Sequence, residues 1–125
     1  MNSLPPIGFH LSIKGGLDKA VDRTIERGCD ALQIFAGNPR GWKIKKRSKR
    51  EINRFREKRQ SAGIQTVAIH ACYLINLSAS DKKVHQRSAK RMARELELAS
   101  KINSDYYVIH PGSNKDKPMD WCIKR

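Results

Sequence analysis

Cysteine, acidic side chains and long apolar runs are all scarce in this chain of 125 residues. The three cysteines, Cys29, Cys72 and Cys122, include no CxxC pair and no even set, which argues against a disulfide framework and favours a reduced, cytoplasmic protein. No apolar run approaches the ~20 residues of a membrane span and no signal peptide is evident, so we expect no membrane partner. No second thiolate is spaced to join Cys72, so we expect it to pack rather than to bind metal.

The shortage of acids leaves a strongly basic chain, with 12 Asp and Glu against 26 Lys and Arg and a formal net charge of +14. One stretch between residues 40 and 50 holds seven cations and no acid: Arg40, Lys43, Lys45, Lys46, Arg47, Lys49 and Arg50. Such runs are usually solvated faces. This one follows a predicted strand and contains Trp42, which can stack on a base or a sugar. We therefore interpret it as a loop that neutralises the phosphates of a nucleic acid, with a plain solvated face as the alternative.

Strand-type and helix-type segments alternate along the chain. Short apolar runs predict strands at residues 7–11, 31–36, 66–70 and 106–110. Apolar residues at helical spacing predict a helix from Leu17 to Ile25, and Ser48 with Glu51 forms a capping box for a second. A third helix carries one stripe of Val84, Ser88, Met92, Leu96 and Ala99. Strict alternation without a hairpin signal predicts a parallel sheet covered by helices, in one domain.

Two of these predicted strands end on a histidine, His70 and His110. Consecutive parallel strands place their carboxyl ends side by side, at the edge where α/β barrels hold their chemistry. Two neutral imidazoles there are either half of a metal site or histidines that only hydrogen-bond at a strand end, and spacing does not separate the two. His10 ends the first strand, where we expect it to support a site rather than to bind the metal.

The final residues resemble the start of a fourth helix, with Pro118 at or before its first turn. A chain of this length is ample for a globular core, but an eight-stranded (β/α) barrel needs about 250 residues. We therefore expect residues 1–125 to be the amino-terminal half of one barrel domain, truncated to about its first four β/α units.

Four segments in a fixed order cover nearly the whole chain: GFHLSIKGGL (8–17), ALQIFAGNPRGW (31–42), HACYLINL (70–77) and HPGS (110–113). Together they resemble the endonuclease IV family of apurinic/apyrimidinic endonucleases. The resemblance implies a xylose-isomerase-like TIM barrel with a three-zinc cluster at the carboxyl ends of its strands. It also implies a function in DNA base-excision repair, in which double-stranded DNA is hydrolysed 5′ to an abasic site to leave a 3′-hydroxyl.

The resemblance assigns roles to individual residues. His70 and His110 match two histidines that bind the same zinc. The side chains that enter the duplex and hold the abasic nucleotide out of the stack are matched by Arg40, Tyr73 and Leu74. A wedge suits this lesion because unstacking is cheapest at a damaged step. Gly41 replaces a common Gln and softens the loop of Arg40. Further DNA contacts are expected from the basic loop, namely Trp42, Lys45, Lys46 and Arg47.

The family's remaining ligands, carboxylates and further histidines, have no counterpart in these residues. We expect the chain alone to be inert and to bind zinc weakly, and to associate through open sheet edges with itself or with a second half-barrel. Two other functions are open: a sugar isomerase or epimerase of the related barrels, and a non-catalytic DNA-binding half-barrel. The wedge residues and the charge of +14 argue against the first of these.

Overall fold

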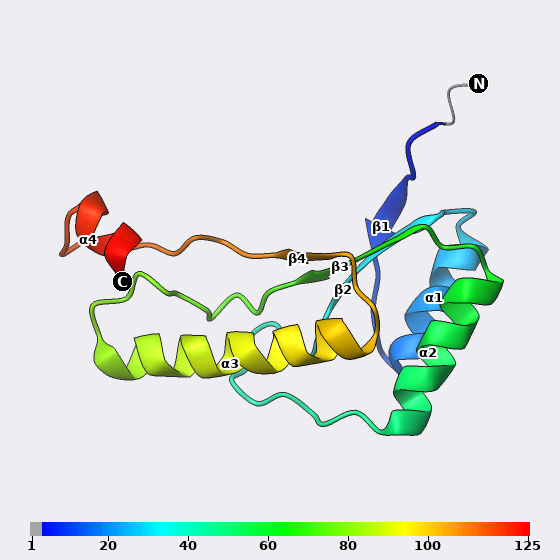
Figure 1. Ribbon diagram of the computed structural model, residues 1–125, viewed down its shortest axis with the longest axis horizontal. Helices are drawn as coiled ribbons and strands as arrows, with labels where there is room; N and C mark the ends of the chain where they lie inside the picture. Colours follow the sequence, from blue (N-terminus) through cyan, green and yellow to red (C-terminus); the bar gives the residue numbers. More distant parts are fainter. Residues whose placement is uncertain (1–3) are drawn as a thin grey trace.

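Four parallel strands alternate with helices along the chain in the computed structural model, which describes residues 4–125 (Figure 1). The strands are β1 (Gly8–His10), β2 (Ala31–Phe35), β3 (Thr66–His70) and β4 (Tyr106–Val108). The helices that follow them are α1 (Leu17–Glu26), α2 (Lys49–Ser61), α3 (Lys82–Lys101) and α4 (Met119–Lys124). The predicted α/β architecture with parallel strands is confirmed. None of the described helices has the length and apolar composition needed to cross a bilayer.

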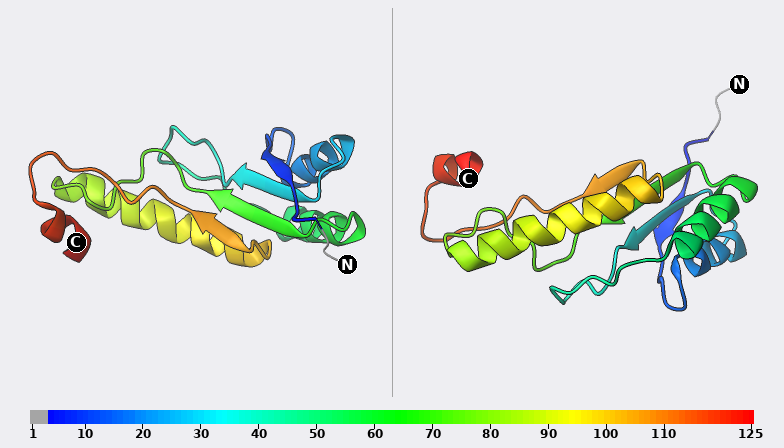
Figure 2. Two further views of the ribbon diagram at one scale, coloured as in Figure 1. Left: turned by 90° about the horizontal axis from the view of Figure 1, so that it is seen from above. Right: turned by 60° about the horizontal axis from the view of Figure 1, so that its bottom comes forward.

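Strand order in the sheet follows the sequence, β1-β2-β3-β4, and every neighbouring pair is parallel. The register aligns Phe35 of β2 with His70 of β3, and His70 with Val108 of β4. All four carboxyl ends therefore lie along one edge of the sheet. Figure 2 shows α1 and α2 together beside β1 and β2, and α3 running along β3 and β4.

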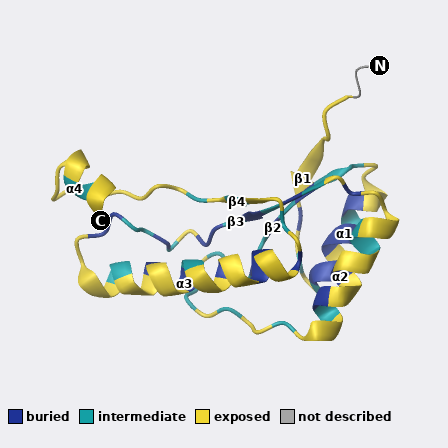
Figure 3. Ribbon diagram, viewed as in Figure 1, coloured by how far each residue is buried: buried dark blue, intermediate teal, exposed yellow. Residues whose placement is uncertain are grey.

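Successive side chains of each strand point to opposite faces of the sheet. Leu32, Ile34, Val67 and Ile69 form the side packed against the helices and are at most 2% exposed (Figure 3). The other side is only partly covered, and its residues are Ala31, Gln33, Phe35, Thr66, Ala68 and His70. In a closed barrel, this side lines the interior.

β4 is shorter than predicted and ends two residues before His110. Its neighbour β3 ends at His70, which pairs with Val108, so Ile109 and His110 have no partner strand. The peptide N–H of Ala71 donates to the Val108 carbonyl (2.8 Å) and closes the ladder there. His110 consequently lies in the loop that follows the strand.

The predicted apolar stripe of α3 is wrong at one position. Leu96 is 40% exposed, whereas its neighbour Glu95 is 1% exposed and Arg91 2% exposed. The helix is rotated so that this ion pair, rather than Leu96, faces inward, toward the loops after β2 and β3 and toward Tyr107 of β4. Ser88 and Ala99 are buried as the pattern predicted.

Polar contacts fix how α2 sits against α1. The Ser48 hydroxyl accepts a hydrogen bond from the peptide N–H of Glu51, as the capping box predicts. The Glu51 carboxylate does not return to the cap; it accepts from the N–H of Leu17 at the start of α1 (3.1 Å). Lys58 lies between the two helices and donates to Asp18 (2.9 Å) and to Asp22 (2.8 Å). These contacts order the two helices that support the loops after β1 and β2.

Candidate metal and nucleic-acid site

His70 and His110 lie next to each other at the carboxyl edge of the sheet, with ring centroids 5.3 Å apart. His70 is half-buried at the end of β3, and His110 is exposed in the loop after β4. Neighbouring parallel strands bring the rings together although 40 residues separate them in sequence. The two imidazoles are close enough for one metal ion to lie between them.

The hydrogen bond of His70 suits a metal ligand. Its Nδ1 lies 2.8 Å from the carbonyl oxygen of Ala71, which can only accept, so Nδ1 carries the proton. The lone pair of Nε2 is then free for a cation, and an N–H donated to a carbonyl is the usual way in which metal-binding histidines are oriented.

His10 lies on the other side of His70, with ring centroids 6.3 Å apart. Its Nδ1 accepts a hydrogen bond from the side-chain amide of Gln33 (2.9 Å), which fixes the ring against β2. Burial of the ring, and then the nearby charge of His70, lower the pKa of His10 and favour its neutral form. The structure thus places His10 beside His70, held by the Gln33 side chain.

Among residues 4–125 there is no cluster of three or more His, Cys, Asp and Glu side chains placed to hold a metal. Tetrahedral zinc takes four ligands, of which at least three come from protein in most sites. The described residues therefore offer at most two imidazole ligands of one zinc ion at this edge.

Tyr73 stands over this edge. The side chain is 56% exposed, and its ring meets Phe35 and His70 nearly edge-on, at 5.2 and 5.6 Å between centroids. Leu74 is half-buried and packs against the small apolar cluster of Ala71 and Cys72. The exposed Arg40 lies in the loop after β2, whose Pro39 carbonyl accepts from the N–H of Tyr73 (2.9 Å). The three residues of the predicted wedge thus come from two loops that touch beside the histidines.

A hollow of about 870 Å³ extends from His10 and Phe35 between the loop after β1 and the loop after β2. Its basic lining consists of Lys14, Lys43, Lys45 and Arg47, and no acidic residue takes part. Lys14 was not singled out from the sequence, because it lies outside the dense charge run. The hollow gives this edge of the sheet a cationic surface next to the histidines.

The other residues of the charge run are placed differently from one another. The Arg47 side chain is only 9% exposed, and its guanidinium donates to the Glu51 carboxylate (3.0 Å). Lys46 lies along a separate hollow beside Arg94 and Lys101 of α3. Trp42 is half-buried in the same loop. Burial and pairing with Glu51 leave the Arg47 guanidinium poorly placed to contact a phosphate.

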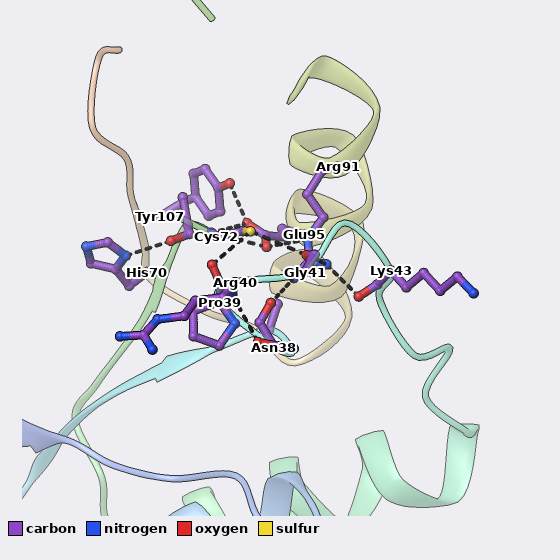
Figure 4. A network of polar contacts seen from close by, with 12 residues as sticks. Asn38, Pro39, Arg40, Gly41, Lys43, His70, Cys72, Arg91, Glu95 and Tyr107 are labelled. Atoms are coloured by element: carbon purple, nitrogen blue, oxygen red, sulfur yellow. Dashed lines mark hydrogen bonds and ion pairs between the residues drawn. The ribbon is translucent and has the colours of Figure 1, made fainter. Parts of the chain in front are cut away.

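A buried network behind the two loops escaped the sequence interpretation (Figure 4). Arg91 and Glu95 of α3 pair at 2.7 Å (Nε to Oε1) and are almost fully buried. Their other partners are backbone groups of the loops, together with the hydroxyl of Tyr107, which donates to Glu95 (2.7 Å). Burial, and then this hydrogen bond to the carboxylate, raise the pKa of Tyr107. The only sequence signal was an i, i+4 charge pair on a helix, which normally indicates a solvated face.

Comparison with known proteins gives one consistent result. A family model described as a xylose isomerase-like TIM barrel matches residues 21–125. The chain is 40% identical over 119 residues to a probable endonuclease 4 of Halothermothrix orenii and 42% identical over 118 residues to that of Persephonella marina. These matches cover 95% and 94% of this chain but only 43% and 41% of the relatives, so the chain spans less than half of their length.

Solved structures agree with the sequence relatives. The crystal structure of endonuclease IV from Thermus thermophilus superposes with a TM-score of 0.87 at 37% identity, covering 96% of this chain and 44% of that one. A D-psicose 3-epimerase superposes with a TM-score of 0.70 at 15% identity, covering 97% of this chain. The second likeness concerns the fold alone.

Proposed function

The chain belongs to the family of xylose isomerase-like TIM barrels, in its endonuclease IV branch, and we propose that it forms the His70–His110 half of a zinc-dependent apurinic/apyrimidinic endonuclease. The observation that carries the proposal is the juxtaposition of these two imidazoles, 5.3 Å apart, with the exposed Tyr73 ring beside them. A metal next to an exposed aromatic side chain suits an enzyme that cuts a DNA backbone where a base is missing.

In this proposal His70 and His110 hold one zinc ion, and ligands beyond residues 4–125 complete the cluster. When bound, zinc supplies a water of lowered pKa and stabilises charge on the phosphate and on the leaving oxygen. The protein keeps the His70 ring in place through the Ala71 carbonyl and keeps His10 in place through Gln33. The rings of His70 and His10 are therefore oriented before a metal binds.

Recognition of the lesion rests on the wedge. Tyr73 reaches out from the edge of the sheet and, with Arg40 and Leu74, enters the gap left by the missing base. Filling this gap offsets the cost of holding the abasic nucleotide out of the stack. Lys14, Lys43 and Lys45 line the adjoining hollow, where they neutralise phosphates without reading sequence.

The test is a chimera in which residues 4–118 replace the matching part of the Thermus thermophilus enzyme. The substrate is a labelled duplex with a central tetrahydrofuran, a stable abasic analogue. We expect zinc-dependent nicking 5′ to the analogue and a 3′ end that a DNA polymerase extends. His70→Ala and His110→Ala are expected to abolish nicking.

His85→Ala serves as the matched control. His85 is a histidine of α3 that donates to the Leu77 carbonyl (3.0 Å), away from the paired rings, so this variant keeps its activity. A folded chimera that retains full nicking after loss of His70 and His110 contradicts the proposal. So does a folded, zinc-loaded chimera that leaves the duplex intact and instead epimerises a ketose.

A further inference from the structure

The buried ion pair of α3 contacts both loops that carry the wedge. Arg91 donates from Nη1 to the carbonyls of Gly41 (2.9 Å) and Lys43 (2.7 Å), and from Nη2 to that of Asn38 (3.3 Å). All three carbonyls belong to the loop after β2, on both sides of Arg40. One guanidinium thus holds three points of that loop.

Glu95 contacts the other loop. Its two carboxylate oxygens accept from the peptide N–H of Cys72 (3.3 Å each), the residue before Tyr73. The Cys72 thiol crosses back to the first loop, donating to the carbonyls of Pro39 (3.2 Å) and Gly41 (3.5 Å). The two loops are therefore hydrogen-bonded to each other, and the Arg91–Glu95 ion pair lies behind this contact.

From this geometry we infer that Arg91 and Glu95 are positioning residues that set where Arg40 and Tyr73 stand relative to each other and to the histidines. The inference rests on the proposed function in its reference to DNA, but the positioning itself does not depend on it. Hydrogen bonds that involve charged groups are stronger than neutral ones, and this pair concentrates them on loop backbone. Gly41, next to Arg40, adds no side chain that would restrict the backbone of the first loop. The conformation of this loop is therefore held by its hydrogen bonds to Arg91 rather than by local rigidity.

A buried pair can also exist only to keep the fold, and the two roles make different predictions. Replacing a buried ion pair with apolar residues of similar size is often neutral or stabilising for the fold. The Arg91→Met/Glu95→Leu variant therefore keeps the helix packed while releasing the loops. Cys72, only 3% exposed, reports on the release once Cys29 and Cys122 are replaced by serine.

The experiment measures the reaction rate of Cys72 with a thiol reagent in this serine background. We expect the apolar double variant to react about tenfold faster or more, because local opening of the loops exposes the thiol. The far-UV circular dichroism spectrum is expected to be unchanged, and the urea midpoint unchanged or higher. The matched control is Glu97→Leu/Lys101→Met, which removes an exposed i, i+4 pair from the same helix and leaves the rate unchanged.

Arg91→Lys covers the case in which the double variant does not fold. A lysine keeps the charge opposite Glu95 but cannot reach three carbonyls at once, so faster labelling in a folded protein is again expected. Labelling at the parent rate in whichever of the two variants folds overturns the inference.

DNA binding by the same proteins separates this inference from the proposed function. In fluorescence anisotropy, release of the loops is expected to lower the preference for a tetrahydrofuran duplex over the intact duplex. If Cys72 responds as expected but the parent binds neither duplex, the positioning role stands and the proposed function fails. If the parent prefers the abasic duplex and the variants keep that preference with Cys72 protected, the function stands and the positioning role fails.

Discussion

Removal of two lysines from the hollow beside His10 is expected to flatten the salt dependence of duplex binding. Lys43 and Lys45 are both exposed and line this hollow together with Phe35. Each phosphate contact changes the slope of log K against log salt by about 0.9, so two contacts in the Lys43→Ala/Lys45→Ala variant make it shallower by about 1.8. Between about 50 and about 200 mM salt, the parent then loses about 12-fold more affinity than the variant does.

The assay is anisotropy of a fluorescein-labelled duplex at several salt concentrations. The control variant Arg27→Ala/Arg56→Ala removes the same charge at the opposite end of the strands: Arg27 caps the carboxyl end of α1, and Arg56 lies beside Ile64, which precedes β3. It is expected to keep the parent slope, because long-range attraction alone does not release the same counterions. Equal slopes in the two double variants would refute the idea that DNA lies along this hollow.

Three further outcomes are expected. Glu95→Ala leaves the Arg91 charge buried without its partner and lowers the free energy of unfolding by about 3–5 kcal/mol in urea titrations. The control Glu97→Ala removes an exposed carboxylate and has little effect. Similar losses of stability in both variants would contradict the buried-pair argument. The hydrogen bond from Lys58, and to a lesser degree its charge, lower the pKa of Asp22 in the folded protein. This contact therefore stabilises the fold above the ordinary carboxyl pKa, and the stabilisation is lost as pH falls through the pKa of the folded state. Lys58→Met should flatten the fall of the urea midpoint between about pH 5 and about pH 3, and an unchanged profile would exclude the contact. The 125-residue chain expressed alone is expected to self-associate in sizing chromatography, because β1 and β4 each have an unpaired side in the described sheet and salt screens its charge beyond ~8 Å. A sharp monomer peak at micromolar concentration would count against this.

The alternation of strands and helices could be predicted because each element carries its own periodic pattern. Leu32 and Ile34 alternate with partly exposed residues, and Ser48 marks the start of α2 locally. The histidine pair could also be predicted, since parallel strands in sequence order align their carboxyl ends whatever their side chains are. What these features share is that local patterns, together with the general rule that consecutive parallel strands lie side by side, are enough to predict them.

Features that depend on distant partners could not be predicted. β4 ends at Val108 only because β3 ends at His70. Arg91 and Glu95 are buried only because the loop after β2 turns three carbonyls toward α3, and that burial moves Leu96 to the surface. Arg47 was grouped with its exposed neighbours because it precedes the first residue of α2, where i, i+4 spacing to Glu51 does not by itself predict a contact. The charge pattern of the sequence locates a basic loop, but it does not show which of the basic side chains in that loop face solvent.

The most direct test of the account is a zinc titration followed by NMR of the imidazole nitrogens in the 125-residue chain. The account predicts that His70 and His110 shift together at the same zinc concentration, with weak affinity, since two ligands fill half of a tetrahedral site. It also predicts that His70→Ala removes the response of His110, while His85 stays unchanged throughout. A response of His110 that survives His70→Ala, or zinc binding that shifts His85 instead, would contradict a metal site shared by the two strands.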